Sequence, residues 1–307
     1  MRAFLLGLVL LTGAVIPLAA QDRVWLGKAR LFTNDKLGDG QDRWRSGSYA
    51  LSWIRGTEWK GSAPSEFGAL VEYRIRSEII APANLLNPVI GTDRRYVGAL
   101  SFGAFSHMQK GKTDVTVGLD LVVTGPQTGI DQFQAFAHRA LGLGAPLVFG
   151  SQIGNAVYPT VSLEIARDFD LSIANGRRVS FRPFFEAQAG VETFARIGGD
   201  LTFGDLGVGD MQIRSVVSGF RTPAIKSAKS RGTSFLIGGD AAYVQSSRYL
   251  PTTSGFTVQN PRVRMRAGVY SEGKKMSLFY GLTWLGKEFT NQTTSQIVGS
   301  FSVRMKF

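Results

Sequence analysis

The chain has 307 residues, with 35 Lys and Arg against 23 Asp and Glu, and a formal net charge of +12. It contains no cysteine, so disulfide frameworks, zinc ribbons and thiol nucleophiles are excluded. Charged residues make up 19% of the chain, a share too small for a disordered polyelectrolyte. The basic balance indicates an anionic partner, which can be nucleic acid, acidic lipid or a phosphorylated ligand.

The first 20 residues have the three parts of a secretory signal. Arg2 precedes an apolar run from Ala3 to Ile16, and small residues that permit cleavage after Ala20 follow. The run is shorter than the roughly 20 residues that a spanning helix needs. We therefore expect a cleaved signal peptide at residues 1–20 and a single exported domain at residues 21–307.

Apolar and polar side chains alternate with a period of two along much of this domain, clearly so at residues 71–76 and 262–269. The period is typical of strands with one apolar and one polar face, in a soluble sandwich or a membrane barrel. The last strand alternates too and ends in Phe307, which resembles the signal by which outer-membrane barrels are recognised for assembly. Together with the secretory signal, it favours an outer-membrane barrel.

Turn residues divide the domain into about 12 strands, an even number that suits a bacterial barrel with both termini in the periplasm. The first, third and fifth connections, near residues 35–45, 80–92 and 125–154, then face outward. The predicted fold class is all-β, an antiparallel transmembrane β-barrel with a short extracellular loop helix. The expected strands lie near residues 24–34, 46–56, 66–79, 93–107, 113–124, 155–172, 178–194, 196–204, 233–247, 261–272, 275–287 and 294–307.

Charged residues of both signs lie on the polar faces of these strands. Opposite charges at this density predict a lumen filled by ion pairs and count against an open general porin. The inward-facing charged residues are Glu72, Arg74, Arg76, Asp120, Glu164, Arg182, Glu186, Arg262, Arg264 and Arg266.

Histidine, a general base suited to neutral pH, occurs only at positions 107 and 138. His107 comes at the end of an expected strand, just before the turn Lys110–Lys112, so we expect a solvated turn residue. His138 lies in the fifth connection, in a segment with the pattern of a short helix.

Thr128 and Asp131 resemble an N-terminal cap for this helix, and Gly142 is a stop signal. An apolar stripe with helical spacing lies beside a polar stripe. With the apolar side against the barrel, the helix would point His138 and Gln134 at a molecule entering beside it. A loop helix with an incidental surface histidine is the alternative. The apolar stripe comprises Ile130, Phe133, Ala137 and Leu141, and the polar stripe Asp131, Gln134 and His138.

Oxygen-bearing side chains gather in the first outward turn, residues 34–47, which also reads as an ordinary hairpin turn. It is not an EF-hand, because Leu37 and Ser46 stand where that motif needs carboxylate or amide ligands. Asn34, Asp35 and Ser46 nevertheless stand at the facing ends of two paired strands. Their oxygens can bind one hard cation there, with help from carbonyls and water.

Other catalytic signatures are absent from the sequence: it has no Gly-x-Ser-x-Gly elbow, no His-Glu-x-x-His and no P-loop. It has no nucleic-acid-binding module either, so the basic charge favours lipid phosphates as partners over nucleic acid.

Two segments of the chain together resemble the LpxR family, the lipid A 3′-O-deacylases of the Gram-negative outer membrane. The resemblance spans most of the mature chain, but its specific motifs lie in the N-terminal half. The segments Gln152–Asn155 and Asp93–Gly98 match less closely. The matching residues are Asn34-Asp35, Asp42-Arg43-Trp44-Arg45-Ser46-Gly47, Gly125-Pro126 and His138-Arg139-Ala140-Leu141-Gly142.

The resemblance implies a 12-stranded barrel with an active site between its wall and a loop helix, at the level of the outer leaflet. It implies calcium-dependent removal of the 3′-linked acyloxyacyl chain from lipid A. It also makes His138 the catalytic histidine, Asn34 and Asp35 the family's Asn-Asp pair, and Ser46 its hydroxyl position.

Ester hydrolysis fits these residues on chemical grounds as well. His138 can activate water as a general base, and Ca²⁺ held partly by Asp35 and Ser46 can polarise the ester carbonyl. We therefore expect a monomeric carboxylic ester hydrolase of the outer membrane, with lipopolysaccharide as its substrate and Gln134 in contact with it. A phospholipase with Ser46 as nucleophile and a non-catalytic barrel or pore are the other possibilities.

Overall fold

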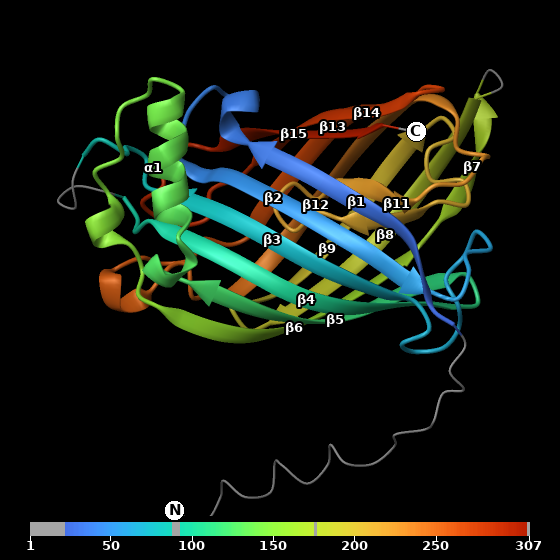
Figure 1. The fold of residues 1–307 in the computed structure, drawn as a ribbon, viewed down its shortest axis with the longest axis horizontal. Helices are drawn as coiled ribbons and strands as arrows, with labels where there is room; N and C mark the ends of the chain where they lie inside the picture. Colours follow the sequence, from blue (N-terminus) through green and yellow to red (C-terminus); the bar gives the residue numbers. More distant parts are fainter. Residues whose placement is uncertain (1–21, 88–92, 175–176, 306–307) are drawn as a thin grey trace, which may run out of the picture.

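The computed structural model describes residues 22–87, 93–174 and 177–305 (Figure 1). The expected signal peptide and the terminal Phe307 lie outside the described residues. Their roles in export and assembly therefore stay predictions.

Twelve antiparallel staves close into a barrel. Strands adjacent in the barrel are also consecutive along the chain, β1 pairs with β15, and β6 pairs with β8. β7 (Phe169–Ala174) continues the line of β6 and pairs with the other half of β8, so the two strands form one stave. The predicted barrel is confirmed, and the strand expected at 155–172 is β6 and β7 together. Strand β6 covers Ala156–Arg167, and the other eleven staves are β1 (Val24–Asn34), β2 (Trp44–Gly56), β3 (Val71–Ala81), β4 (Val97–Lys110), β5 (Thr113–Thr124), β8 (Arg177–Ala189), β9 (Glu192–Phe203), β12 (Gly232–Ser247), β13 (Arg262–Glu272), β14 (Met276–Leu285) and β15 (Gln296–Met305).

The connections that follow β1, β3 and β5 all lie at one end of the barrel, as predicted (Figure 1). The last of them carries helix α1 (Ile130–Ala140), which crosses this end of the wall. Both ends of the described chain lie at the opposite end, which corresponds to the periplasmic side. Among the described residues, no helix is long and apolar enough to cross a membrane.

The wall of the barrel exposes apolar side chains and buries charged ones. On β3, Tyr73 and Ile75 are each 41% exposed, whereas Glu72, Arg74 and Arg76 are 9% exposed or less. A soluble sandwich would show the reverse, because its apolar face packs into a core. The outer wall is therefore an apolar band that suits lipid acyl chains.

Ion pairs fill the lumen, as the sequence predicted. Arg266 Nε donates to Asp200 Oδ1 at 2.9 Å, and its Nη1 donates to Asp240 Oδ2 at 2.5 Å. Towards the outer end, Arg45 Nε donates to Glu288 Oε1 at 2.8 Å and pairs with Glu78 as well. These charges are balanced by opposite charges nearby, so no wide polar channel is needed to solvate them.

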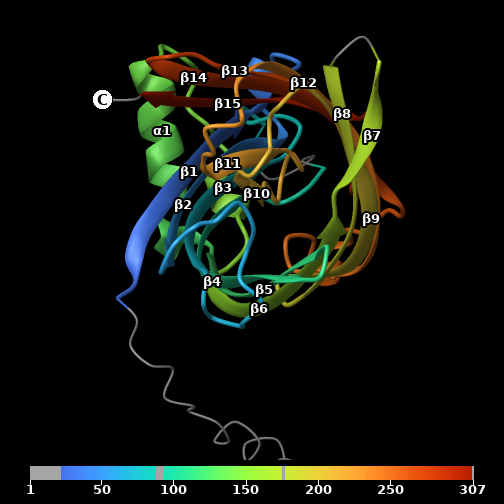
Figure 2. The same cartoon turned by 90° about the vertical axis from the view of Figure 1, so that its right-hand side faces the viewer.

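A small hairpin, β10 (Met211–Arg214) and β11 (Arg221–Ile225), lies inside the barrel (Figure 2). It belongs to the connection between β9 and β12, and its Ile213 and Ala224 pack with Ala29 and Ile54 of the wall. The sequence did not predict it, because its strands of 4 and 5 residues lack the lipid-and-lumen alternation that identifies the staves.

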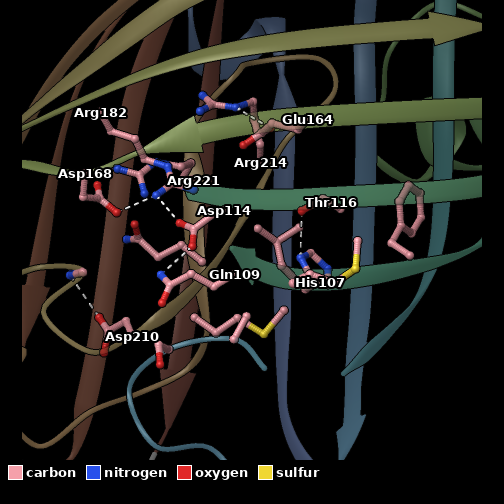
Figure 3. A pocket seen from close by; sticks show the side chains of 18 of the residues that line it. His107, Gln109, Asp114, Thr116, Glu164, Asp168, Arg182, Asp210, Arg214 and Arg221 are labelled. Carbon is pink, nitrogen blue, oxygen red and sulfur yellow. Dashed lines mark hydrogen bonds and ion pairs between the residues drawn. The ribbon is translucent and has the colours of Figure 1, made fainter. Parts of the chain in front are cut away.

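A cavity of about 300 Å³ lies between this hairpin and the wall (Figure 3). His107 lines it, with Nε2 2.9 Å from Glu72 Oε2 and Nδ1 3.0 Å from Thr116 Oγ1. The expectation of a solvated turn residue is wrong, because β4 continues to Lys110 and carries His107 inside the lumen. The cavity does not include His138, so the candidate site must be sought elsewhere.

Candidate active site

Helix α1 turns its polar stripe towards the barrel. Gln134 and His138 are buried, at 4% and 8% exposed, while Phe133 and Leu141 are 61% and 73% exposed. The expected orientation, with the apolar stripe against the wall, is therefore wrong for Phe133 and Leu141, while Ile130 is buried and Ala137 half-buried. The helix has this orientation because it lies at the membrane surface. There, exposed apolar side chains can contact lipid, and the polar side packs on the polar mouth of the barrel.

The ends of the helix also differ in part from the expectation. Gly129, with φ of 67°, is the N-cap, and Thr128 ends a preceding 3₁₀ turn (Pro126–Thr128). The Thr128 hydroxyl contacts the Ile130 amide only at 3.4 Å. Gly142 follows the last turn with φ of 68°, so the predicted stop is confirmed.

His138, Asp42 and Ser46 form a hydrogen-bonded chain under the helix. His138 Nε2 lies 2.9 Å from Asp42 Oδ2, and Ser46 Oγ donates to the other oxygen of the same carboxylate. His138 Nδ1 lies 2.8 Å from the carbonyl oxygen of Gly144, which can only accept a hydrogen bond. The ring is thus held from both sides, and the arrangement suits an imidazolium that donates from both nitrogens.

Asp35 lies beside this chain and is fully buried. Its Oδ2 accepts from the Arg43 amide at 2.7 Å, but its Oδ1 is buried with no hydrogen-bond partner among the described residues. Burial raises the pKa of Asp35 to about 8, and the nearby Asp42 and Asp39 carboxylates add to the rise. The loop therefore buries a carboxylate with no positive partner to stabilise its charged form.

A β-bulge in β2 brings these groups together. The pairing of β2 with β3 shifts between Trp44 and Gly47, and Trp44 has a φ of 49°, unusual for any residue but glycine or asparagine. Its ring is buried, and its Nε1 donates to Asp93 Oδ2 at 2.6 Å, which holds this conformation in place. The bulge turns Ser46 inward at the level of the helix.

Gln296 of β15 joins the bulge to Asp35. Its Oε1 accepts from the Arg45 amide at 3.1 Å, and its Nε2 lies 2.6 Å from the Arg43 carbonyl oxygen and 3.4 Å from Asp35 Oδ2. At 2% exposed, this side chain fixes Asp35 relative to the segment that ends in Ser46.

Unpartnered polar atoms surround the chain of His138, Asp42 and Ser46. Gln134 Oε1 and the Tyr96 hydroxyl are both buried without a hydrogen-bond partner among the described residues. Burial raises the pKa of Tyr96, and the nearby Asp131 and Asp42 carboxylates raise it further. A substrate that brings hydrogen-bond donors and acceptors under the helix would satisfy both groups.

The structure brings all the predicted site residues to one place at the outer mouth. Asn34 is the last residue of β1, where its Oδ1 caps the turn at Asp35 by accepting from the Lys36 amide at 2.8 Å. Gly47 lies opposite it, and Asn34 Nδ2 packs where a side chain at Gly47 would begin. Sequence reasoning named Asp42 only as part of a motif and did not give it a role. Its position four residues before Ser46, in an acidic turn, is the sequence feature that could have indicated a role for Asp42.

The fit of a metal ion rests on the unpartnered Asp35 Oδ1. The described residues contain no group of three or more His, Asp or Glu side chains arranged to hold a metal. Asp35 and Asp42 nevertheless offer carboxylate oxygens, and Ser46 offers a hydroxyl, which are hard donors of the kind that Ca²⁺ prefers. These residues fit a cation that takes its remaining ligands from carbonyls and water.

The fold and the site together define an outer-membrane β-barrel with a polar site at its outer mouth. The family model described as outer membrane protein LpxR matches residues 4–307, almost the whole chain. The chain therefore belongs to the LpxR family, as the sequence motifs predicted.

One solved structure agrees with this chain on the fold, and two others are less similar. LpxR from Salmonella typhimurium is 17% identical and superposes with a TM-score of 0.75, covering 92% of this chain and 100% of that one. The β domain of the Bordetella autotransporter BrkA is 13% identical with a TM-score of 0.40, covering 92% of this chain and 99% of that one. The KdgM porin in complex with disordered oligogalacturonate is 7% identical with a TM-score of 0.37, covering 90% and 98%. No curated protein sequence matches the chain.

Proposed function

We propose that this protein is a calcium-dependent lipid A deacylase that removes the 3′-linked acyloxyacyl chain in the outer leaflet. Its family is that of lipid A deacylases. The observation that carries the proposal for this chain is the hydrogen-bonded chain of His138, Asp42 and Ser46 beneath a helix whose apolar side is exposed. The groups proposed to carry out hydrolysis thus lie beside an exposed apolar surface that suits lipid.

His138 acts as the general base. The Gly144 carbonyl holds the proton of the neutral ring on Nδ1, so Nε2 is the nitrogen that would take a proton from water, once its contact with Asp42 Oδ2 opens to admit that water. Asp42 Oδ2, next to Nε2, stabilises the imidazolium that results, and Ser46 fixes Asp42 by its hydrogen bond to Oδ1. The geometry of the structure therefore matches the ring after it has taken up a proton.

Calcium would be held by Asp35, with Ser46 as a second protein ligand, and when bound it would polarise the ester carbonyl. Asn34 caps the turn that presents Asp35 and keeps its carboxylate in place. Because Asp35 is buried without a positive partner, a bound cation would also stabilise its ionised form.

The substrate would bind with its sugar and ester groups under α1 and its acyl chains along the wall. Gln134 Oε1 would accept a hydrogen bond from a hydroxyl or amide group of the lipid, a contact that no described residue supplies. Phe133, Phe136 and Leu141 would contact acyl chains, since they are each more than 60% exposed at the mouth of the barrel.

The geometry favours water over Ser46 as the nucleophile. In a nucleophilic triad the histidine lies between the serine and the acid. Here Asp42 lies between the other two, and Ser46 Oγ donates its proton to a carboxylate instead of to His138. A phospholipase with a serine nucleophile is therefore the weaker alternative, and the filled lumen weakens the alternative of a pore.

The decisive experiment is mass spectrometry of lipid A from a Gram-negative host with and without the gene. We expect loss of the mass of the 3′-acyloxyacyl group when the gene is expressed, and no loss with His138→Ala. Activity should vanish in excess chelator and return with Ca²⁺. Unchanged lipid A in cells with an assembled wild-type barrel would refute the assignment.

A further inference from the structure

Two basic side chains stand apart from the other charges of the wall, because they face the lipid. Lys28 and Arg30 are exposed in the middle of β1, whereas the other exposed charges on described strands lie at or near strand ends. Neither has an acidic partner in the described part of the chain. Placing an ionisable group in the membrane costs free energy, and such groups usually mark a functional site. An anionic ligand is therefore the partner that suits this pair.

The level of this pair in the membrane follows from its neighbours. Lys28 is opposite Trp53 of β2, and Trp53 is opposite Tyr73 of β3. Tyr73 in turn makes an edge contact with Trp25, with the ring centroids 6.0 Å apart. Trp and Tyr gather at the headgroup level of a bilayer. This belt lies towards the end of β1 that is remote from α1, which is the periplasmic leaflet.

A third cation lies on the same outer face. Arg55 is exposed opposite Trp25, and its guanidinium lies 5.7 Å from the centre of the Trp25 ring. Arg30, opposite Leu51, is one step nearer the bilayer centre than Lys28. The three side chains therefore span the boundary between the acyl chains and the headgroups.

The barrel seam runs beside these residues. Among the described residues, β1 pairs with β15 only from Phe32 to Asn34, at the outer end. Below it, Arg304 of β15 crosses the seam and donates to the backbone carbonyl of Lys28 and, at 3.1 Å, to that of Ala224. Below Phe32 the seam is therefore bridged by side-chain contacts of Arg304 with backbone carbonyls.

We propose that Lys28, Arg30 and Arg55 bind the phosphate of an anionic glycerophospholipid in the periplasmic leaflet. The charge is complementary, the flanking rings of Trp25 and Trp53 suit the glycerol and upper acyl region, and the cations span the boundary between acyl chains and headgroups, within reach of a phosphate. This site is independent of ester hydrolysis, which belongs to the opposite mouth of the barrel. A lipid held there would also cover the lower half of the seam.

Native mass spectrometry of the full mature barrel, released from detergent micelles with added dioleoyl phosphatidylglycerol, tests the proposal. We expect the wild type to retain one lipid molecule and the double variant Lys28→Gln/Arg30→Gln to bind it about 25-fold more weakly, at about fivefold for each cation. Phosphatidylcholine should be retained less than phosphatidylglycerol, and millimolar inorganic phosphate should not displace the lipid.

Matched variants separate a specific site from general charge. Lys110→Gln/Arg167→Gln removes two exposed cations from other strands and should leave lipid retention unchanged. Lys28→Arg/Arg30→Lys should keep binding, while heat-dependent gel mobility checks that each barrel is folded. Equal retention in the Lys28→Gln/Arg30→Gln variant, equal loss in the control variant, or displacement by inorganic phosphate would each overturn the proposal. Deacylation of detergent-dispersed lipid A should stay normal in the double variant, so this test and that of the enzyme activity fail separately.

Discussion

Replacing Asp42 by Asn tests the role of the shared carboxylate. The substitution keeps the shape of the side chain but removes the charge that faces His138 Nε2 at 2.9 Å. A hydrogen bond to a charged group contributes about 1.5–3 kcal/mol. If the imidazolium forms in the transition state, losing this contact should lower kcat/KM by about 10- to 150-fold, since each 1.4 kcal/mol is about tenfold.

The assay is release of fatty acyl chains from purified lipid A in detergent with excess Ca²⁺, with kcat and KM measured separately. The fall should appear in kcat, because Asp42 acts on the base and not on the lipid. Asp39→Asn is the matched control: it removes a carboxylate of the same loop that contacts Arg43 and the amides of Gln41 and Ile297, and not His138. Asp42→Asn at the wild-type rate, or an equal loss in Asp39→Asn, would show that the contact with His138 has no catalytic role.

Three further results are expected. His138→Asn should lower kcat by at least about 10²-fold, the usual contribution of a general base, while heat-dependent gel mobility stays normal; wild-type turnover would remove the base from the mechanism. For Asp35, the folded state holds the proton more tightly, with a pKa of about 8 against about 3.9 when unfolded. In chelator, stability to urea should therefore fall as pH rises from about 4 to 8, by up to about 5 kcal/mol. Asp35→Asn should abolish this slope and Ca²⁺ should oppose it; a flat profile in the wild type would contradict the buried, unpaired carboxylate. Phe133→Ser/Phe136→Ser should raise KM with little change in kcat, and an unchanged KM would show that lipid does not contact this side of α1.

The barrel was predictable from the sequence because a strand between lipid and lumen must alternate. Segments such as 71–76 display the period of two directly, and the ion pairs of the lumen follow from the charged residues on the inward face. The hairpin β10–β11 was not predictable in this way. It lies inside the wall and packs against its lumen side, so no contact with lipid imposes a period of two on its side chains.

The candidate site was predictable in its members but not in its connections. Asn34, Asp35, Ser46 and His138 meet at one mouth because both segments are outward connections. The role of Asp42 depends on a bulge at Trp44, and no local sequence pattern predicts the positive φ of that residue. Helix α1 was expected with its apolar side inward because that rule holds in water, and it fails where the surroundings are lipid.

Because of Gln296, the site can form only after the barrel has closed. It belongs to the last strand, yet it holds the Arg43–Arg45 backbone and contacts Asp35 near the start of the chain. These contacts can form only after β15 has joined β1, so an unassembled chain in the periplasm lacks an ordered site. Gln296→Ala should assemble normally but lose activity, and full activity would contradict this view. If the proposed function holds, closure of the barrel would act as a safeguard, because the enzyme would gain its activity only after it has been built into the membrane it acts on.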